Sequence, residues 1–229
     1  NNLQLAKKVS LNSAYGALGS QYFRFYDLRQ ALAVTMAGQL SIRWIENKMN
    51  KYMNSILKTD GIDYVIASDT DSIYLRLGDL VQKVYNEKTD TNAIIAFMDK
   101  VCETKIQDYI NESYKELANY VHAYDQKMRM KREALSDKGI WTAKRRYILN
   151  VYNNEGVQYK EPQLKVMGLE MVKSSTPSVI REKMYALIQL LVIGTQDDVH
   201  RFIADFREQF KKLPVEDVSF PRGINGLAK

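Results

Sequence analysis

The sequence contains one cysteine, Cys102, and no uninterrupted apolar run of the about 18 residues that a membrane-spanning helix requires. A single cysteine excludes an internal disulfide framework, and its place on the apolar face of an expected helix favours a packing role. His122 is an isolated histidine near the end of that helix, which is more typical of a surface or dipole role than of a metal ligand. We therefore expect neither a disulfide scaffold nor a membrane span.

The rest of the composition is that of a soluble globular protein. Of the 229 residues, 45% are hydrophobic and 26% are charged, which is sufficient for one or two domains with a real core. The net charge of +6 and the pI of about 9.1 permit an anionic partner without identifying one. Because the sequence begins at Asn1 without a methionine and directly inside a helical pattern, we expect it to be a piece of a longer protein.

Residues 64–77 form the most informative stretch, because two runs of β-forming residues flank the sequence Ser-Asp-Thr-Asp. This pattern predicts a β-hairpin with carboxylates at its tip, and apolar and polar residues alternate in its second run. Asp69 and Asp71 are two positions apart, so in an extended strand they would lie on one face. Paired carboxylates repel each other unless a cation neutralises them, and their hard oxygens suit Mg²⁺.

Three other interpretations of this stretch have to be weighed. Asp and Ser favour turns without any metal. Asp-x-Asp after a buried strand is also typical of aspartyl phosphotransferases, with Asp69 as the nucleophile, but residues 73–77 continue as a strand instead of leaving into a helix. An EF-hand is weaker still, because it requires Gly and Glu at positions where this sequence has neither. The residues alone leave the metal site and the simple turn open.

Polar side chains share one face of the first expected helix, which covers residues 3–18. Lys8, Asn12 and Tyr15 lie at positions i, i+4 and i+7, and Gly16 allows a backbone or ligand to approach closely. Such a stripe suits a triphosphate and a base, and a solvated polar face is the alternative.

Two long helices are predicted before and after the hairpin. The first begins at Asp27, with Gln30 as its capping-box partner, and continues to about residue 58, a length of roughly 45 Å. Its apolar stripe is expected at Leu28, Leu32, Ile45, Met49, Tyr52, Met53, Ile56 and Leu57. A short helix is expected over 79–86, a loop over 86–92 and the second long helix over 92–121.

Residues 128–160 change to the period of β-strands. We expect strands over 128–134, 140–152 and 157–160 with turns at 136–139 and 153–156, and we expect this meander to join the 62–77 hairpin in one antiparallel sheet. The basic sequence Lys144-Arg145-Arg146-Tyr147 then lies inside a strand, with Lys144 and Arg146 on one face and Arg145 and Tyr147 on the other. Cations beside an aromatic ring suit phosphate and groove contacts, and a charged edge strand is the alternative.

The last part of the chain is helical. Ser174–Pro177 predicts a helix start with a hydroxyl cap and a proline in the first turn, and Gly194 is expected to end this helix. Asp197 and Asp198 predict the start of another helix, and residues 213–229 are expected to be a loose tail.

In this order, the motifs resemble those of family B DNA polymerases, in particular the replicative enzymes of T-even-like bacteriophages. The resemblance covers residues 1 to about 210. Its sequences are Lys8-x-x-x-Asn12-Ser13-x-Tyr15-Gly16, Phe25-Tyr26-Asp27-Leu28-Arg29, Ser68-Asp69-Thr70-Asp71-Ser72, Lys144-Arg145-Arg146-Tyr147, Met167-Gly168-Leu169-Glu170 and Ser174-Ser175-Thr176-Pro177. Each motif is short, and their ordered combination is specific.

The resemblance implies an α+β fold, with an antiparallel palm sheet backed by long helices and followed by a partial helical thumb. It assigns residues 1–19 to the end of a fingers helix, 20–168 to the palm and 169–229 to the partial thumb. It also implies a DNA-directed DNA polymerase that adds deoxynucleotides to a primer 3′-hydroxyl with two Mg²⁺ ions. If the protein is phage-encoded, it is expected in the cytoplasm of the host cell.

The resemblance gives roles to individual residues. Asp71 would be a direct metal ligand with Asp69 beside it, and Glu133 would assist the metal site. The motif with Lys144, Arg145, Arg146 and Tyr147 would bind DNA, with Arg145 and Tyr147 at the primer end. The nucleotide-binding positions would be Lys8, Asn12, Tyr15 and Gly16, with Lys8 and Asn12 on the triphosphate and Tyr15 on the nascent base pair.

Three departures from the family pattern limit this expectation. Ser68 stands where the family usually has Gly, and Arg145 replaces the commoner Lys. The family's other palm aspartate has no counterpart here. We therefore expect the chain alone to be inactive, with metal absent or weakly bound, and to need the remaining polymerase segments or a separate subunit. The alternative is a non-catalytic module that binds primer-template DNA.

Overall fold

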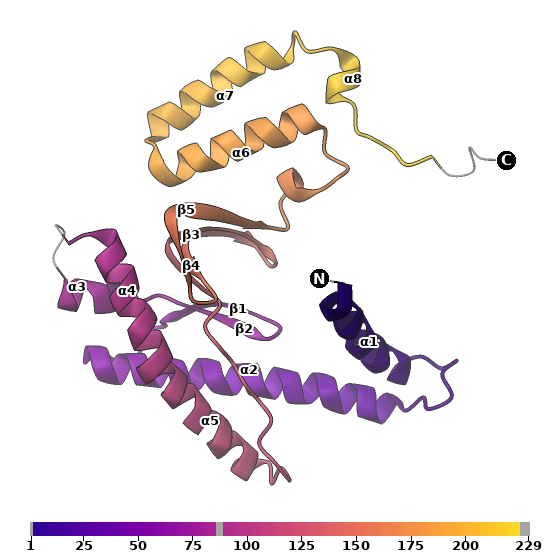
Figure 1. Cartoon of the computed structure of the whole chain (residues 1–229), viewed down its shortest axis with the longest axis vertical. Coiled ribbons are helices and arrows are strands. Elements are labelled where there is room, and N and C mark those ends of the chain that lie inside the picture. Colours follow the sequence, from indigo (N-terminus) through magenta and orange to yellow (C-terminus); the bar gives the residue numbers. More distant parts are fainter. Residues whose placement is uncertain (1, 86–88, 225–229) are drawn as a thin grey trace. The chain divides into compact units, whose positions relative to one another are not determined.

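The computed structural model describes residues 2–85 and 89–224, and its backbone groups into two compact units. The first contains the chain up to Ile94 together with Lys100–Lys131, and the second contains Ile95–Asp99 and the chain from Arg132 onward. Helices and small antiparallel sheets together confirm the expected α+β class (Figure 1). No helix in the described parts is both long and apolar enough to cross a lipid bilayer.

Two helices open the first unit. They are α1 (Asn2–Leu18) and α2 (Leu28–Leu57), which has 30 residues, as the sequence predicted. Asp27 is the N-cap of α2, but its carboxylate accepts a hydrogen bond from the backbone N–H of Arg29 at 2.9 Å, so the expected capping box with Gln30 is not formed.

The buried face of α2 is shorter than predicted. The predicted positions Ile45, Met49, Met53 and Leu57 are buried and recur every four residues in the second half of the helix. The expected stripe positions Leu28, Leu32 and Ile56 are instead 50%, 54% and 43% exposed. Periodicity predicted the helix and four of its buried positions, but it did not show that Leu28, Leu32 and Ile56 stay exposed.

The second long helix is continuous from residue 91 to residue 120 but changes its pitch. It consists of α4 (Thr91–Val101), the π-helical segment η1 (Cys102–Ile106) and α5 (Gln107–Tyr120). The wider π turn was not predicted, and Cys102 is buried in it. Figure 1 shows α5 crossing α2, where the indole N–H of Trp44 donates to the carbonyl of Ser113 at 2.9 Å.

The hairpin lies between these helices in the sequence. Its strands β1 (Val65–Asp69) and β2 (Ser72–Leu75) pair antiparallel, as predicted, and a bulge at Ile66 shifts their register. The short helix α3 (Gly78–Val84) follows, close to its predicted place. Of the loop expected over 86–92, residues 86–88 lie outside the described residues, and α4 already begins at Thr91.

The second unit contains a separate antiparallel sheet in the order β3-β4-β5. Its strands are β3 (Ala134–Ala143), β4 (Arg146–Asn154) and β5 (Val157–Met167). The prediction of a single sheet that includes the 62–77 hairpin is therefore wrong for the described residues, which form two sheets. The strand expected over 128–134 is also wrong, because regular pairing starts only at Ala134.

The turn predicted at 136–139 is instead the middle of β3. Lys138 pairs with Asn150 and Gly139 with Leu149, and the Asn150 amide donates to the Asp137 carboxylate at 2.8 Å. A Cβ atom at Gly139 would lie 2.6 Å from the Trp141 ring. This glycine therefore makes room for a neighbouring indole, and the chain reverses later, at 144–145.

Helices complete the second unit. They are the 3-10 segment η2 (Glu170–Val172), α6 (Ser178–Ile193), α7 (Gln196–Phe210) and α8 (Val215–Val218), the last within the expected tail. The predicted hydroxyl cap of α6 is wrong, because Pro177 is its N-cap and the Thr176 hydroxyl donates to the Glu170 carbonyl at 2.7 Å. Ile148, Met171 and Ile188 form a core cluster that joins β4 to α6.

Met53 tests how strongly the hairpin depends on α2. Met53, Leu57 and Tyr64 form one buried cluster at the base of the hairpin. We expect Met53→Ala to lower the free energy of unfolding by about 2–5 kcal/mol, because it leaves a cavity in that cluster. Chemical denaturation measures this, and Ile56→Ala, which is 43% exposed on the same helix, is the control with an expected change within about 0.5 kcal/mol. Equal losses for both variants would contradict the assignment of this core.

Candidate active site

The hairpin tip is a two-residue turn formed by Thr70 and Asp71. Asp69 pairs with Ser72 directly below the turn. Within this turn, the backbone N–H of Asp71 donates to the carbonyl of Asp69 at 2.6 Å, which closes a γ-turn centred on Thr70. Two side chains brace it, because the hydroxyl of Thr70 donates to the Asp69 carboxylate at 3.0 Å and that of Ser72 to the Asp69 carbonyl at 3.1 Å.

This geometry corrects the expected arrangement of the two carboxylates. Thr70 has a φ of 54°, a left-handed conformation that is unfavourable for a β-branched residue and costs about 1–3 kcal/mol. Asp69 therefore ends a strand and Asp71 lies in the turn, instead of both sharing one face of an extended strand. Both residues nevertheless belong to one hairpin tip, with Asp69 half-buried and Asp71 exposed.

The buried phenol of Tyr114 on α5 lies within electrostatic reach of Asp71. Burial raises the pKa of the Tyr114 hydroxyl above its ordinary value of 10.0, and the negative charge of Asp71 raises it further. Both effects favour the neutral form of the Tyr114 hydroxyl, and sequence periodicity alone did not connect this residue with Asp71.

The chemistry of the tip fits a hard cation such as Mg²⁺. Asp69 and Asp71 supply carboxylate oxygens, the ligand type that Mg²⁺ prefers, and the other positions around the ion would fall to water or phosphate. Within residues 2–85 and 89–224, His, Cys, Asp and Glu side chains form no group of three or more suited to a metal ion. The chain therefore offers two carboxylates at the tip and no larger cluster in its described parts.

The predicted nucleotide-binding residues lie on α1, a helix without buried residues. Lys8, Asn12 and Gly16 are exposed, and no atom lies within 4 Å of where a Cβ at Gly16 would be. The Tyr15 hydroxyl shares a hydrogen bond of 2.7 Å with the hydroxyl of Thr35 on α2. The stripe therefore exists as predicted, with its phenol fixed against the next helix.

Glu133 belongs to the second unit, just before β3. Its carboxylate pairs with Lys165 of β5, and its carbonyl accepts a hydrogen bond from the N–H of Glu155 at 2.6 Å. The guanidinium of its neighbour Arg132 forms an ion pair with Asp99 and donates a hydrogen bond to the Asn153 amide oxygen at 2.8 Å. Glu133 is thus an exposed carboxylate on a firmly anchored segment.

The basic motif forms the turn between β3 and β4, and not the interior of a strand. Lys144 and Arg145 are the turn residues, Arg145 has a left-handed φ of 61°, and β4 starts at Arg146. The predicted alternation of the four side chains across two strand faces is therefore wrong. The three cations lie exposed around a hairpin turn, and Tyr147 is half-buried behind them.

Gly168 lies directly against this turn. It has a φ of +70°, and a Cβ atom there would approach the Arg145 carbonyl oxygen to 2.1 Å. Next to it, Arg146 pairs with Glu170 at 3.2 Å. Hydrogen bonding within its own segment and to Lys173, together with the nearby charge of Arg146, lowers the pKa of Glu170 below 4.5, so the carboxylate is ionised at neutral pH.

Comparison with known proteins decides the family. The family model described as DNA polymerase family B matches residues 1–220. This chain belongs to DNA polymerase family B. It is 36% identical over 238 aligned positions to the DNA-directed DNA polymerase of Enterobacteria phage T4 and 37% identical over 235 to that of Escherichia phage RB69.

These matches cover 100% and 99% of this family B chain but only 26% of each phage protein. The chain therefore spans about a quarter of the length of these relatives. A shorter match, 38% identical over 36% of the chain, is to the DNA polymerase alpha catalytic subunit of Trypanosoma brucei brucei. The matches support the motif-based resemblance over the whole chain.

Gly168→Ala tests the close packing under the basic turn. We expect it to lower the free energy of unfolding by about 1–3 kcal/mol more than Gly156→Ala, because only position 168 adds a backbone clash. Gly156 is a matched control, since it also has a positive φ, +88°, but no atom within 4 Å of its Cβ position. Chemical denaturation of both variants measures the difference, and equal losses would show that the turn can move away freely.

Proposed function

We propose that this chain is part of a DNA-directed DNA polymerase that extends a primer 3′-hydroxyl by two-metal nucleotidyl transfer. The observation that carries the proposal is the presence of two carboxylates, Asp69 and Asp71, on one braced hairpin tip in a family B chain. The phage relatives that align along the whole chain are named DNA-directed DNA polymerases, which supports the same reaction.

The proposal assigns Asp71 and Asp69 to Mg²⁺. When bound, two such ions would stabilise the attacking and leaving oxygens of an in-line displacement. The protein's own contribution is to place both carboxylates at one hairpin tip, where the hydroxyls of Thr70 and Ser72 donate hydrogen bonds to Asp69. Lys8 and Asn12 would bind the triphosphate of an incoming deoxynucleotide.

The remaining assignments complete the proposed site. Tyr15 would line the nascent base pair, with its hydroxyl oriented by Thr35, and Gly16 would leave space for the nucleotide beside it. Glu133 would assist the metal site. Arg145 and Tyr147, with Lys144 and Arg146, would hold the primer strand of primer-template DNA.

We further propose the division into a fingers segment, a palm and a partial thumb at residues 1–19, 20–168 and 169–229. Because the second palm aspartate of the family has no counterpart among these 229 residues, the chain alone is proposed to be inactive. It would work with the remaining polymerase segments or a partner subunit, in the cytoplasm of a host cell.

Asp71→Ala tests the proposed reaction in a complete polymerase that carries this sequence. We expect primer extension to fall to background while DNA binding is largely kept. The carboxylate is proposed to bind the metal ions of the reaction and is not needed to bind the DNA duplex. Primer-extension and filter-binding assays measure the two effects. Asp60→Ala, an exposed aspartate outside the tip, is the control and should extend primers normally. Retained synthesis by the Asp71 variant would refute the proposal.

A second candidate is a non-catalytic module that binds primer-template DNA. The exposed cations of the β3–β4 turn favour it. In that case the isolated chain binds DNA with a strong salt dependence and incorporates no nucleotide.

The DNA contact itself is tested with Arg145→Ala in the isolated chain. We expect the slope of log affinity against log salt to shrink by about one unit, because one phosphate contact is lost. Arg43→Ala, an exposed arginine on α2, is the control and should leave the slope unchanged. Identical slopes for the two variants would exclude the turn as a phosphate-binding element.

A further inference from the structure

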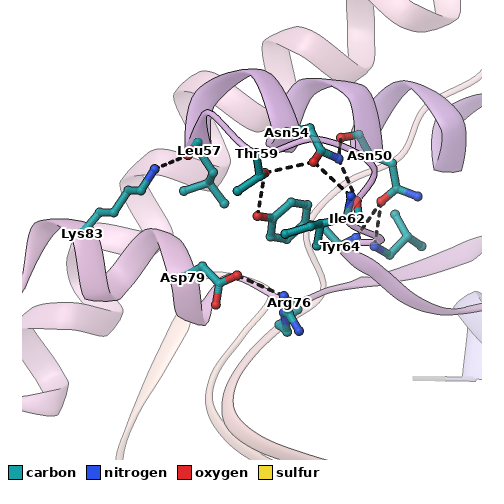
Figure 2. A network of polar contacts seen from close by, with 10 residues as sticks. Asn50, Asn54, Leu57, Thr59, Ile62, Tyr64, Arg76, Asp79 and Lys83 are labelled. Carbon is teal, nitrogen blue, oxygen red and sulfur yellow. Dashed lines mark hydrogen bonds and ion pairs between the residues drawn. The ribbon is translucent and has the colours of Figure 1, made fainter.

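One carboxamide of α2 holds the start of the hairpin. The Asn50 side-chain oxygen accepts hydrogen bonds from two successive backbone N–H groups, those of Tyr64 and Val65, each at 2.9 Å (Figure 2). Its amide nitrogen donates to the Asp63 carboxylate at 2.6 Å. These three contacts of one side chain fix the residues at the start of β1.

A second carboxamide one helical turn later extends this attachment. The Asn54 amide donates to the Ile62 carbonyl at 2.7 Å, and its oxygen accepts from the Ile62 N–H at 3.2 Å and from the Thr59 hydroxyl at 2.9 Å. Thr59 in turn shares a hydrogen bond of 3.0 Å with the Tyr64 hydroxyl. Figure 2 shows these groups converging on Tyr64, whose side chain is fully buried.

The far side of the hairpin base is also fixed to Tyr64. The Arg76 N–H donates to the Tyr64 carbonyl at 2.8 Å, and the Arg76 guanidinium lies 5.5 Å from the centre of the Tyr64 ring. Asp79 holds that guanidinium at 3.0 Å. Both strands are therefore anchored at one end, while the other end carries the strained turn.

Anchoring matters because the pairing of the two strands is irregular at two places. The bulge at Ile66 adds a residue to β1, and Thr70 is left-handed at the tip. Moving β1 by one residue would remove the bulge and would change which residue occupies the turn, and it would carry every following side chain to the opposite face. A fixed start at Tyr64 and Val65 opposes this slip.

We propose that Asn50 is a positioning residue that holds the hairpin in the register that places Asp69 and Asp71 together at the tip. It acts through the backbone of Tyr64 and Val65, whose N–H groups its side-chain oxygen binds. The proposal rests on the function proposed above, because it gives Asn50 a role in the metal site of that reaction.

The test uses Asn50→Ala in a complete polymerase that carries this sequence. Without metal, hydrogen exchange at the amides of Tyr64 and Val65 should accelerate about tenfold, and faster exchange should extend along β1 to the tip. The kcat should fall about 10- to 100-fold and the half-saturating Mg²⁺ concentration should rise, with the KM for DNA unchanged.

Two further variants separate positioning from simple loss of stability. Asn47→Ala is the matched control, because the Asn47 amide donates to Arg43 within α2, at 3.0 Å, and not to the hairpin. The double variant Asn50→Asp with Asp63→Asn exchanges the two partners, so an oxygen at position 50 still accepts from Tyr64 and Val65 and an amide at position 63 still donates. It should recover most of the kcat and of the amide protection.

The outcomes distinguish this inference from the function on which it rests. If Asp71→Ala abolishes synthesis but Asn50→Ala behaves like Asn47→Ala in exchange, kcat and Mg²⁺ dependence, the positioning role is overturned and the function stands. Failure of the exchanged pair to recover activity while recovering amide protection would also overturn it. If Asp71→Ala keeps synthesis, the proposed function fails, and the exchange data alone then report whether Asn50 fixes the register.

Discussion

The attachment of the 65–75 hairpin to helix α2 is the contact on which the candidate active site depends. A two-stranded hairpin is marginal in water, so it needs a partner that covers its base. Tyr64 supplies that contact, because its ring is buried against Met53 and Leu57 while its backbone is held by Asn50. The hairpin that carries Asp69 and Asp71 at its tip is thus attached to α2 through a buried residue at its opposite end.

Regular patterns were sufficient to predict the elements that rely on local periodicity. The hairpin, α1, α2 and the long helix before residue 121 followed from spacing, and the family motifs could be recognised in the sequence. The β3–β4 hairpin could not be predicted in the same way. Gly139 suggested a turn although it makes room for Trp141, and the real turn contains Lys144 and Arg145, which carry no turn signal.

The parts of the candidate sites that sequence reasoning missed depend on partners far along the chain. Asn50 binds backbone groups 14 and 15 residues later, and Trp44 donates to a carbonyl 69 residues later. Arg132 meets Asp99 and Asn153 from two different elements. No periodicity encodes such pairs, because each requires the chain to return to the same place from a distance. The signal that was present, an asparagine on a partly buried helix face, is ambiguous without its partner.

The hairpin tip and the β3–β4 turn share one backbone feature. Thr70 and Arg145 are non-glycine residues with a left-handed backbone, and each occupies the turn that presents the candidate functional side chains. Such conformations persist only where the surrounding structure holds them. At the first turn the holding groups are Asp69, Ser72 and the anchored hairpin base, and at the second the backbone of Gly168 fits directly under the Arg145 carbonyl. In each case the turn that carries the candidate side chains is held in a strained backbone conformation by hydrogen bonds or close packing of its neighbours.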